Sequence, residues 1–278
     1  MAGMRLTLRR AAVVFCAGLA FATAGCTGEP ENPYVALCKD PVVVTCEPAD
    51  GPYSITVDAE AASGDVVGFA GRVQDAVTRT QREVTLYAED ADAVQLDPEV
   101  SVRPKWQVTL QPDGTAESVS GVLEAASVPG ASGISAGAGW PSAVAATLGD
   151  VAPLITALSS TALFADGGSF TVPSLGDRFR LVYVPAYTTM DGVREVISVA
   201  RDYPDAEVLL EAPAAGPNQP TFYVAHLTPD EATQLAARLS APEMASASVP
   251  GAPLAFVLTS LSEQGTDSLT GTFGNVPG

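Results

Sequence analysis

The sequence predicts an α+β fold, a tandem duplication of a ferredoxin-like module in which one extra strand precedes a βαββαβ core. Two observations carry this prediction. Short words recur in the same order in the two halves of the chain, and the longest, ASVPGA at residues 126–131, returns letter for letter at 247–252. In the second half, stretches with strand-like and helix-like hydrophobic spacing follow one another in the order ββαββαβ.

Six other words support the duplication. LQPD at residues 110–113 answers LTPD at 227–230, and REV at 82–84 answers REV at 194–196. The offset between matched residues grows from 112 for Gly64 and Gly176 to 125 for Thr147 and Thr272. Because short words recur by chance in a chain rich in Ala, Gly and Ser, their common order matters more than any single match. We interpret the pattern as one duplication followed by small insertions.

The second half predicts its elements most clearly. A helical stripe over residues 193–200 ends before Pro204, and the capping box TPDE at 228–231 opens a second helix with proline at its first position. Strand-like stretches surround these helices, at residues 169–172, 179–185, 206–211, 221–227 and 253–259.

The first half is ambiguous when taken alone, because residues 66–73 and 84–88 fit either a strand or a helix. Comparison with the second half makes residues 76–89 the first helix, with Val77, Val84 and Ala88 on one stripe, and 115–125 the second helix. The alternative is an N-terminal β-sandwich of immunoglobulin type over residues 50–126, followed by a ferredoxin-like domain.

These elements divide the chain into six parts. We expect a signal peptide at residues 1–25, a tether with a disulfide loop at 26–48, the first repeat at 49–138, a connecting helical segment at 139–164, the second repeat at 165–259 and a C-terminal tail at 260–278.

The amino terminus has the composition of an export signal. Arg5, Arg9 and Arg10 precede an apolar run over residues 11–24, which ends in the word TAGC at residues 23–26. This ending resembles the lipobox of bacterial lipoproteins, with Thr23 where leucine is usual. The resemblance implies cleavage before Cys26, a lipid on its sulfur and an anchor on the extracytoplasmic face of the cell membrane.

Cysteine count and charge agree with an exported protein. Cys38 and Cys46 remain as a pair in an oxidising compartment, and we expect a disulfide rather than a metal site, because no histidine or third thiol is near. The net charge of −18 becomes −21 when the three arginines of the signal are removed. Such a surface repels phosphates, so nucleic acid is excluded as a partner.

One word suggests catalysis. GISAG at residues 133–137 matches the nucleophile elbow of serine hydrolases, and Asp166 and the only histidine, His226, follow it in the order of that family. An elbow needs a buried strand before it and a helix after it, whereas a loop rich in Pro, Gly and Ser precedes Ser135. Alignment of the two copies of ASVPGA sets Ser135 opposite Phe256, so we predict that Ser135 lies on an edge strand or in a loop and that the chain has no catalytic residue. We also expect no cofactor and no metal: Asp90, Asp92, Asp97 and Glu99 are interpreted as solvated acids.

The remaining candidate site is a surface. On the sheet face away from the helices we place Gln107, Thr109 and Gln111 in the first half. In the second half we place a candidate partner surface there, made of Val182, Val184, Phe222, Val224 and His226, together with Trp140. We expect the segment 140–164 to cover this apolar face within the chain.

These features predict a lipid-anchored protein of the cell envelope that binds or scaffolds without catalysis, with another envelope protein as its partner. A ligand-binding accessory lipoprotein of a transporter is the alternative, and a serine hydrolase is a remote one.

Overall fold

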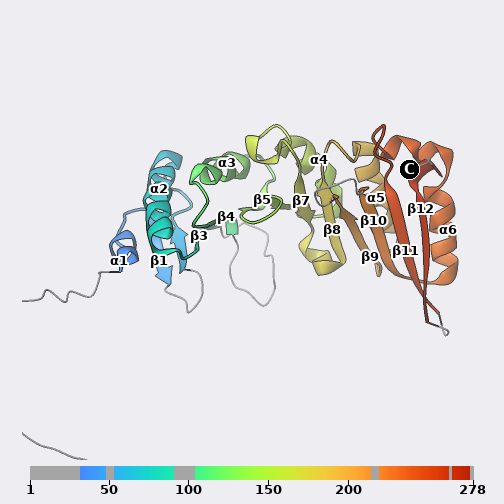
Figure 1. The fold of residues 1–278 in the computed structure, drawn as a ribbon, viewed down its shortest axis with the longest axis horizontal. Helices are drawn as coiled ribbons and strands as arrows, with labels where there is room; N and C mark the ends of the chain where they lie inside the picture. Colours follow the sequence, from blue (N-terminus) through green and yellow to red (C-terminus); the bar gives the residue numbers. More distant parts are fainter. Residues whose placement is uncertain (1–31, 48–52, 91–103, 214–218, 263–264, 276–278) are drawn as a thin grey trace, which may run out of the picture. The chain divides into compact units, whose positions relative to one another are not determined.

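The computed structural model describes residues 32–47, 53–90, 104–213, 219–262 and 265–275 (Figure 1). Within them, twelve strands form one sheet. The strands are β1 (Val43–Glu47), β2 (Tyr53–Val57), β3 (Val84–Glu89), β4 (Pro104–Leu110), β5 (Ser132–Ala136), β6 (Ser142–Val144), β7 (Gly168–Thr171), β8 (Phe179–Tyr183), β9 (Glu207–Glu211), β10 (Thr221–Leu227), β11 (Ala255–Ser262) and β12 (Gly265–Thr272).

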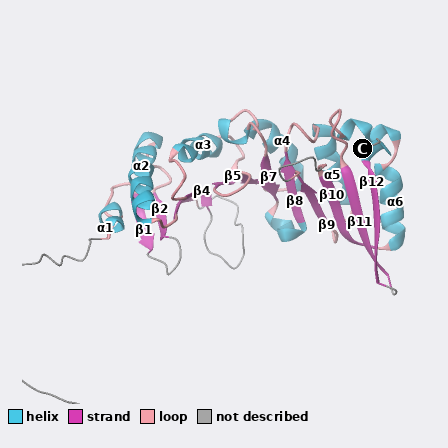
Figure 2. Cartoon of the chain, in the orientation of Figure 1, coloured by secondary structure: helices cyan, strands magenta, loops and turns pink. Residues whose placement is uncertain are grey.

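Helices alternate with pairs of strands along the chain (Figure 2). The α-helices are α1 (Pro33–Leu37), α2 (Ser63–Thr80), α3 (Glu117–Ala126), α4 (Leu148–Leu158), α5 (Met190–Asp202) and α6 (Pro229–Leu239). Short 3-10 helices follow as η1 (Ala162–Phe164), η2 (Pro173–Arg178), η3 (Pro242–Ala247) and η4 (Phe273–Asn275).

The strands lie in the sheet in chain order, from β1 to β12. Parallel neighbours are joined by helices, as in β2–α2–β3 and β4–α3–β5, and antiparallel neighbours such as β3 and β4 join these units. The buried side chains of the strands belong to one core with helices α2 to α6. Because the strands reverse direction between units while the helices stay on one face, successive β–α–β units must alternate in hand, although right-handed units strongly predominate in known folds.

The class α+β is therefore confirmed, but the ferredoxin-like strand order is not found. In a ferredoxin-like module the two strands of each β–α–β unit are separated by a third strand, whereas here they are direct neighbours. Hydrophobic spacing shows which residues form a strand, and it carries no information on which strand lies beside it. The alternative of a β-sandwich over residues 50–126 is wrong, because that segment contains α2 and α3.

The first half corrects one predicted helix. Residues 76–89 do not form a helix: α2 ends at Thr80, Gln81 has a positive φ of 57°, and residues 84–89 form β3. The word REV thus begins β3 at Val84 but lies within α5 at Val196, so this match misled the alignment. The second predicted helix, over 115–125, is confirmed as α3, and the elements predicted for the second half are found as β7 to β11 with α5 and α6.

The sheet also continues through the segments expected to lie outside the repeats. The connecting segment contributes β6 and α4, and the C-terminal tail contributes β12, which pairs with β11 over its whole length. Helix α4 buries Val151, Leu154, Ile155 and Leu158 in the common core, so it covers the same face as the other helices rather than the opposite one.

A β-bulge in β10 decides which side chains face the helices. Val224 pairs with Leu258 and Leu227 with Ser260, so β10 has one more residue than β11 between these two pairs. His226, within the bulge, has a φ of 68°. An extra residue exchanges the two faces of a strand on either side of it. Phe222 and Val224 therefore face the helices and are fully buried, and Tyr223 lies on the opposite face, 39% exposed.

An ion pair connects the helices α5 and α6. Arg238 of α6 donates to Asp202 of α5 at 2.7 Å and to Ser198 of α5 at 2.9 Å. The hydrogen bond from Arg238 lowers the pKa of the Asp202 carboxyl below its usual value. Since Asp202 is half exposed, this contact orients the two helices more than it stabilises the fold.

Candidate functional site

The face of the sheet opposite α2–α6, here called the open face, carries a line of polar side chains. Strand register places one residue on each of seven neighbouring strands in direct cross-strand contact with the next. We call this line the polar row. Its members are Thr45, Thr56, Tyr87, Gln107, Ser135, Ser142 and Ser169.

Hydroxyl groups of the open face bond to one another between strands. The Oγ1 atoms of Thr45 and Thr56 are 2.5 Å apart, and so are the Oγ atoms of Ser135 and Ser142. Beside the row, Thr85 and Thr109 make a third such pair at 3.2 Å. Each hydroxyl has one donor and two acceptor positions. One donor is used within each pair, so the second hydroxyl's donor and several lone pairs remain to be satisfied by water or a ligand.

The row is accessible along most of its length. Thr56 is buried at 6% exposure, whereas Tyr87, Gln107, Ser135, Ser142 and Ser169 are half-buried and Thr45 is exposed. The row is accessible because successive side chains of a strand point to opposite faces of the sheet. Along β4, Trp106 and Val108 point to the helices and are buried, whereas Gln107 and Thr109 point away from the helices and are half-buried. The predicted placement of Gln107 and Thr109 is confirmed.

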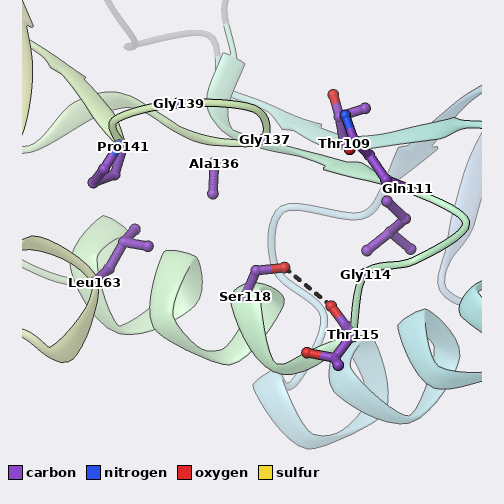
Figure 3. A pocket seen from close by; sticks show the side chains of 11 residues that line it. Thr109, Gln111, Gly114, Thr115, Ser118, Ala136, Gly137, Gly139, Pro141 and Leu163 are labelled. Carbon is purple, nitrogen blue, oxygen red and sulfur yellow. Dashed lines mark hydrogen bonds between the residues drawn. The ribbon is translucent and has the colours of Figure 1, made fainter. Parts of the chain in front are cut away.

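A cavity of about 290 Å³ lies where β4 ends and α3 begins (Figure 3). Thr109 and Gln111 lie on one side, Gly137 and Gly139 on another, and Pro141 with Leu163 provides an apolar wall. Ser118 of α3 points to Thr115 and donates to its carbonyl oxygen at 3.4 Å. The cavity thus offers hydroxyl and amide groups on one side and apolar groups on the other.

A second cavity, of about 220 Å³, lies on the open face itself. Its lining includes three members of the polar row, Gln107, Ser135 and Ser142, and the helix η2 contributes Gly176 and Asp177. The polar row therefore opens into the second cavity. The first cavity is lined by Thr109, two residues after Gln107 on β4, but by no member of the row.

Trp140 stands at the edge of the first cavity. It lies between the lining residues Gly139 and Pro141, and 43% of its surface is exposed. The other tryptophan, Trp106, is 3% exposed and belongs to the core. An exposed indole beside a cavity provides a large apolar surface with one hydrogen-bond donor.

The candidate partner surface is not assembled as the sequence suggested. Phe222 and Val224 lie in the core for the reason given above, and Val182 and Val184 are 6% and 5% exposed. These four are not available to a partner. The side chain of His226 is 59% exposed, with Nε2 at 3.9 Å from Glu207 Oε2. Of that set only Trp140 and His226 are accessible, and they lie on different parts of the sheet.

The remaining predicted positions concern the anchor, the disulfide and metals. Cys26 lies outside the described residues, as do Asp92, Asp97 and Glu99. Cys38 and Cys46 form the predicted disulfide, with Cα atoms 5.6 Å apart. In the part of the chain that the structure describes, no group of three or more His, Cys, Asp or Glu is placed to hold a metal ion, and no helix is long and apolar enough to cross a membrane.

Ser135 and His226 are far apart. Ser135 lies on a strand, β5, but β5 pairs with β4 and β6 and so is not the predicted edge strand. His226 lies on β10, five strands away in the sheet. At about 4.8 Å per strand this separation is about 24 Å. A nucleophile and its base must approach to about 3 Å, so these two residues cannot act together. Residue Ser135 is followed by a turn into β6 and not by a helix, so the geometry of a nucleophile elbow is missing.

We therefore expect that a fluorophosphonate probe adds no mass to the full-length protein. The Ser135→Ala variant should likewise gain no mass on treatment with the probe. The physical reason is that the Ser135 hydroxyl bonds to the hydroxyl of Ser142, and the only histidine of the sequence, His226, lies five strands away. Stoichiometric labelling that disappears in Ser135→Ala would contradict this expectation. Ser142→Ala is the matched control, since it removes the neighbouring hydroxyl only.

Sequence reasoning missed most of the row. Thr56, Tyr87, Ser142 and Ser169 come from different elements, and no local pattern marks them as neighbours. The sequence does show small polar residues at alternate positions of some strands, as at Ser135. Only the register of the strands shows that these residues lie beside one another across the sheet.

Comparison of the chain with protein-family models, with curated proteins and with solved structures gave no match, so the site is interpreted from its own geometry.

Proposed function

We propose that this protein is a lipid-anchored module of the cell envelope that binds an envelope component on the open face of its sheet, without catalysing a reaction. The amino-terminal word that resembles a lipobox supports the anchor at Cys26 and a location on the extracytoplasmic face of the cell membrane. The disulfide between Cys38 and Cys46 supports an oxidising compartment.

The polar row is the observation that carries the binding function. When helices cover one face of a sheet, the other face can be exposed to water. Charged side chains of both signs on that face would be enough to keep the protein soluble. Here seven neighbouring strands present uncharged hydrogen-bonding groups instead, and a recess lined by Gln107, Ser135 and Ser142 adjoins them. Such an arrangement suits a surface that holds a ligand in one orientation.

The size of the recesses favours this function over the alternative of a transporter's accessory lipoprotein. Pockets that enclose small ligands have volumes of about 300–1,000 Å³. The two cavities beside β4, of about 290 and 220 Å³, lie just below that range, and a third, of about 370 Å³ beside Tyr223, lies at its lower end. A ligand that lies across the surface is therefore a better fit than a small solute that the protein encloses.

We also propose that the two halves of the chain descend from a duplication. The words LQPD and LTPD both join the end of a strand to a helix, at β4–α3 and β10–α6, and the two copies of ASVPGA both precede the next strand, β5 or β11. These matches support duplication of a unit whose strands lie in chain order. Whether the unit ever had the ferredoxin-like arrangement is a separate proposal that the observed strand order does not favour.

Photo-crosslinking in living cells tests the binding face. We expect a benzoylphenylalanine in place of Tyr87, on the open face, to form a covalent adduct with an envelope component. The same residue in place of Gln234, exposed on α6, should form none, because that side belongs to the helical layer. Adducts from position 234 alone would contradict the proposal.

The anchor has its own control in the same cells. Cys26→Ala should leave the protein uncleaved or free of the membrane, and it should reduce the adduct from position 87 by removing the protein from its site. An unmodified amino terminus at Cys26 in native material would contradict the lipid anchor.

A further inference from the structure

We propose that the ligand of the open face is a neutral glycan chain, which lies along the polar row with sugar rings against Tyr87 and Trp140. This inference rests on the proposed binding function of that face and names the chemical class of the ligand. Three properties of the described residues carry it: the type of hydrogen-bonding group, the charge and the aromatic surface.

The hydrogen-bonding groups match those of a sugar. A hydroxyl both donates and accepts, and an amide side chain such as that of Gln107 does the same with two separate atoms. Sugar hydroxyls have the same double character, so each can bond to two neighbouring groups of the row. Ser135 and Ser142 lie beside Gln107 in the lining of the second cavity, where three such groups converge. An extended chain with hydroxyls at regular intervals satisfies a row of this kind.

Charge favours a neutral ligand. The row contains no Asp, Glu, Lys, Arg or His, although the chain has a net charge of −18. The ionised groups two residues from a member of the row on the same strand are Lys105 on β4, Glu47 on β1 and Glu89 on β3, and Asp177 lies in the wall of the second cavity. Three of these four groups are acids, so they provide no net attraction for an anion. A sulfated, phosphorylated or uronic acid polymer would be repelled by the rest of the surface.

The aromatic residues provide apolar platforms. Tyr87 belongs to the row itself, and Trp140, 43% exposed, lies two residues before Ser142 of the row. The C–H groups on one face of a sugar ring pack well against an aromatic ring, and the polar atom of each side chain remains available for a hydrogen bond. A protein partner is less suitable, because the centre of a protein interface is poor in serine and the row has three serines among seven residues.

The dimensions fit an extended ligand. Seven strands at about 4.8 Å spacing give a row of about 29 Å, which is long enough for several sugar rings end to end. The second cavity, which opens on the row, is too small to enclose such a chain and suits a substituent or a single ring.

Tryptophan fluorescence of the full-length protein in detergent tests the proposal. Trp140 is open to the neutral quencher acrylamide, whereas Trp106 is buried. The probes are neutral hexasaccharides of N-acetylglucosamine, mannose or galactose, with hexagalacturonate as the anionic comparison. We expect at least one neutral probe to protect Trp140 from quenching in a saturable way, and hexagalacturonate to give no protection.

Variants locate the binding site. Gln107→Ala combined with Ser135→Ala should weaken binding of the protective probe at least tenfold, since each removes about one hydrogen bond worth about 1 kcal/mol. The matched control combines Gln234→Ala with Ser120→Ala, both exposed on helices, and should bind as the unchanged protein does. Unchanged thermal unfolding of both double variants excludes a folding defect.

Two outcomes overturn the proposal: protection by none of the neutral probes, or protection that is equally strong in the row variant. Its failure can be told apart from that of the binding function. If position 87 crosslinks to an envelope protein in cells while no hexasaccharide binds, the open face binds a protein and the glycan is wrong. If position 87 forms no adduct of any kind, the binding function itself is wrong.

Discussion

Phe222→Ala should lower the free energy of unfolding by about 3–5 kcal/mol, the range for removing a large aromatic side chain from a core. Phe222 is fully buried, and its ring centroid lies 5.8 Å from that of Phe273 in an edge-to-face contact. The strand on its other side adds Phe256, which also contacts Phe273. A loss of this size is a large part of the 5–15 kcal/mol typical of a folded protein. Urea denaturation of the full-length protein measures it.

Tyr223→Ala is the matched control, because Tyr223 is the next residue of the same strand and 39% exposed on the open face. We expect it to cost about 1 kcal/mol or less, as is usual for substitutions outside the core. A greater loss for Tyr223→Ala than for Phe222→Ala would mean that the bulge at His226 is not where the register places it, and that Phe222 faces a partner after all.

Removal of the disulfide gives the second large effect. In the chain-entropy model, a bridge that closes the nine residues from Cys38 to Cys46 stabilises the fold by about 2.6 kcal/mol. The bridge holds α1 to β1 at the edge of the sheet, and Asp40 within the loop forms an ion pair with Arg72 of α2. We expect Cys38→Ser with Cys46→Ser to lower the free energy of unfolding by about this amount.

The unchanged protein in a reducing buffer is the control for that pair of substitutions, and it should lose the same stability. Because β1 is the first strand of the sheet, hydrogen exchange should increase there before it increases in β4 or β8. Equal stability in oxidising and reducing buffers would show that the bridge contributes nothing to the fold.

The sequence by itself determined local structure wherever the signal was local. The capping box at residues 228–231 predicted the start of α6, where Thr228 accepts from the Glu231 amide at 3.3 Å and Glu231 accepts from the Thr228 amide at 2.8 Å. Both bonds lie within one helical turn, so neighbouring residues suffice to specify them. The cysteine pair was predictable in the same way, because it closes a short loop. The repeated word ASVPGA predicted a strand or loop at Ser135, and the strand is found as β5, although in the interior of the sheet and not at its edge.

Tertiary structure decided the order of the strands, their register and therefore the site. Hydrophobic spacing is the same whether the two strands of a unit are neighbours or are separated by a third, so the ferredoxin-like order could not be tested within the sequence. A single extra residue in β10 exchanged the faces of Phe222 and Tyr223, because the side-chain period of a strand is two. The polar row depends on both, since Gln107, Ser135 and Ser142 become neighbours only when β4, β5 and β6 pair in this register.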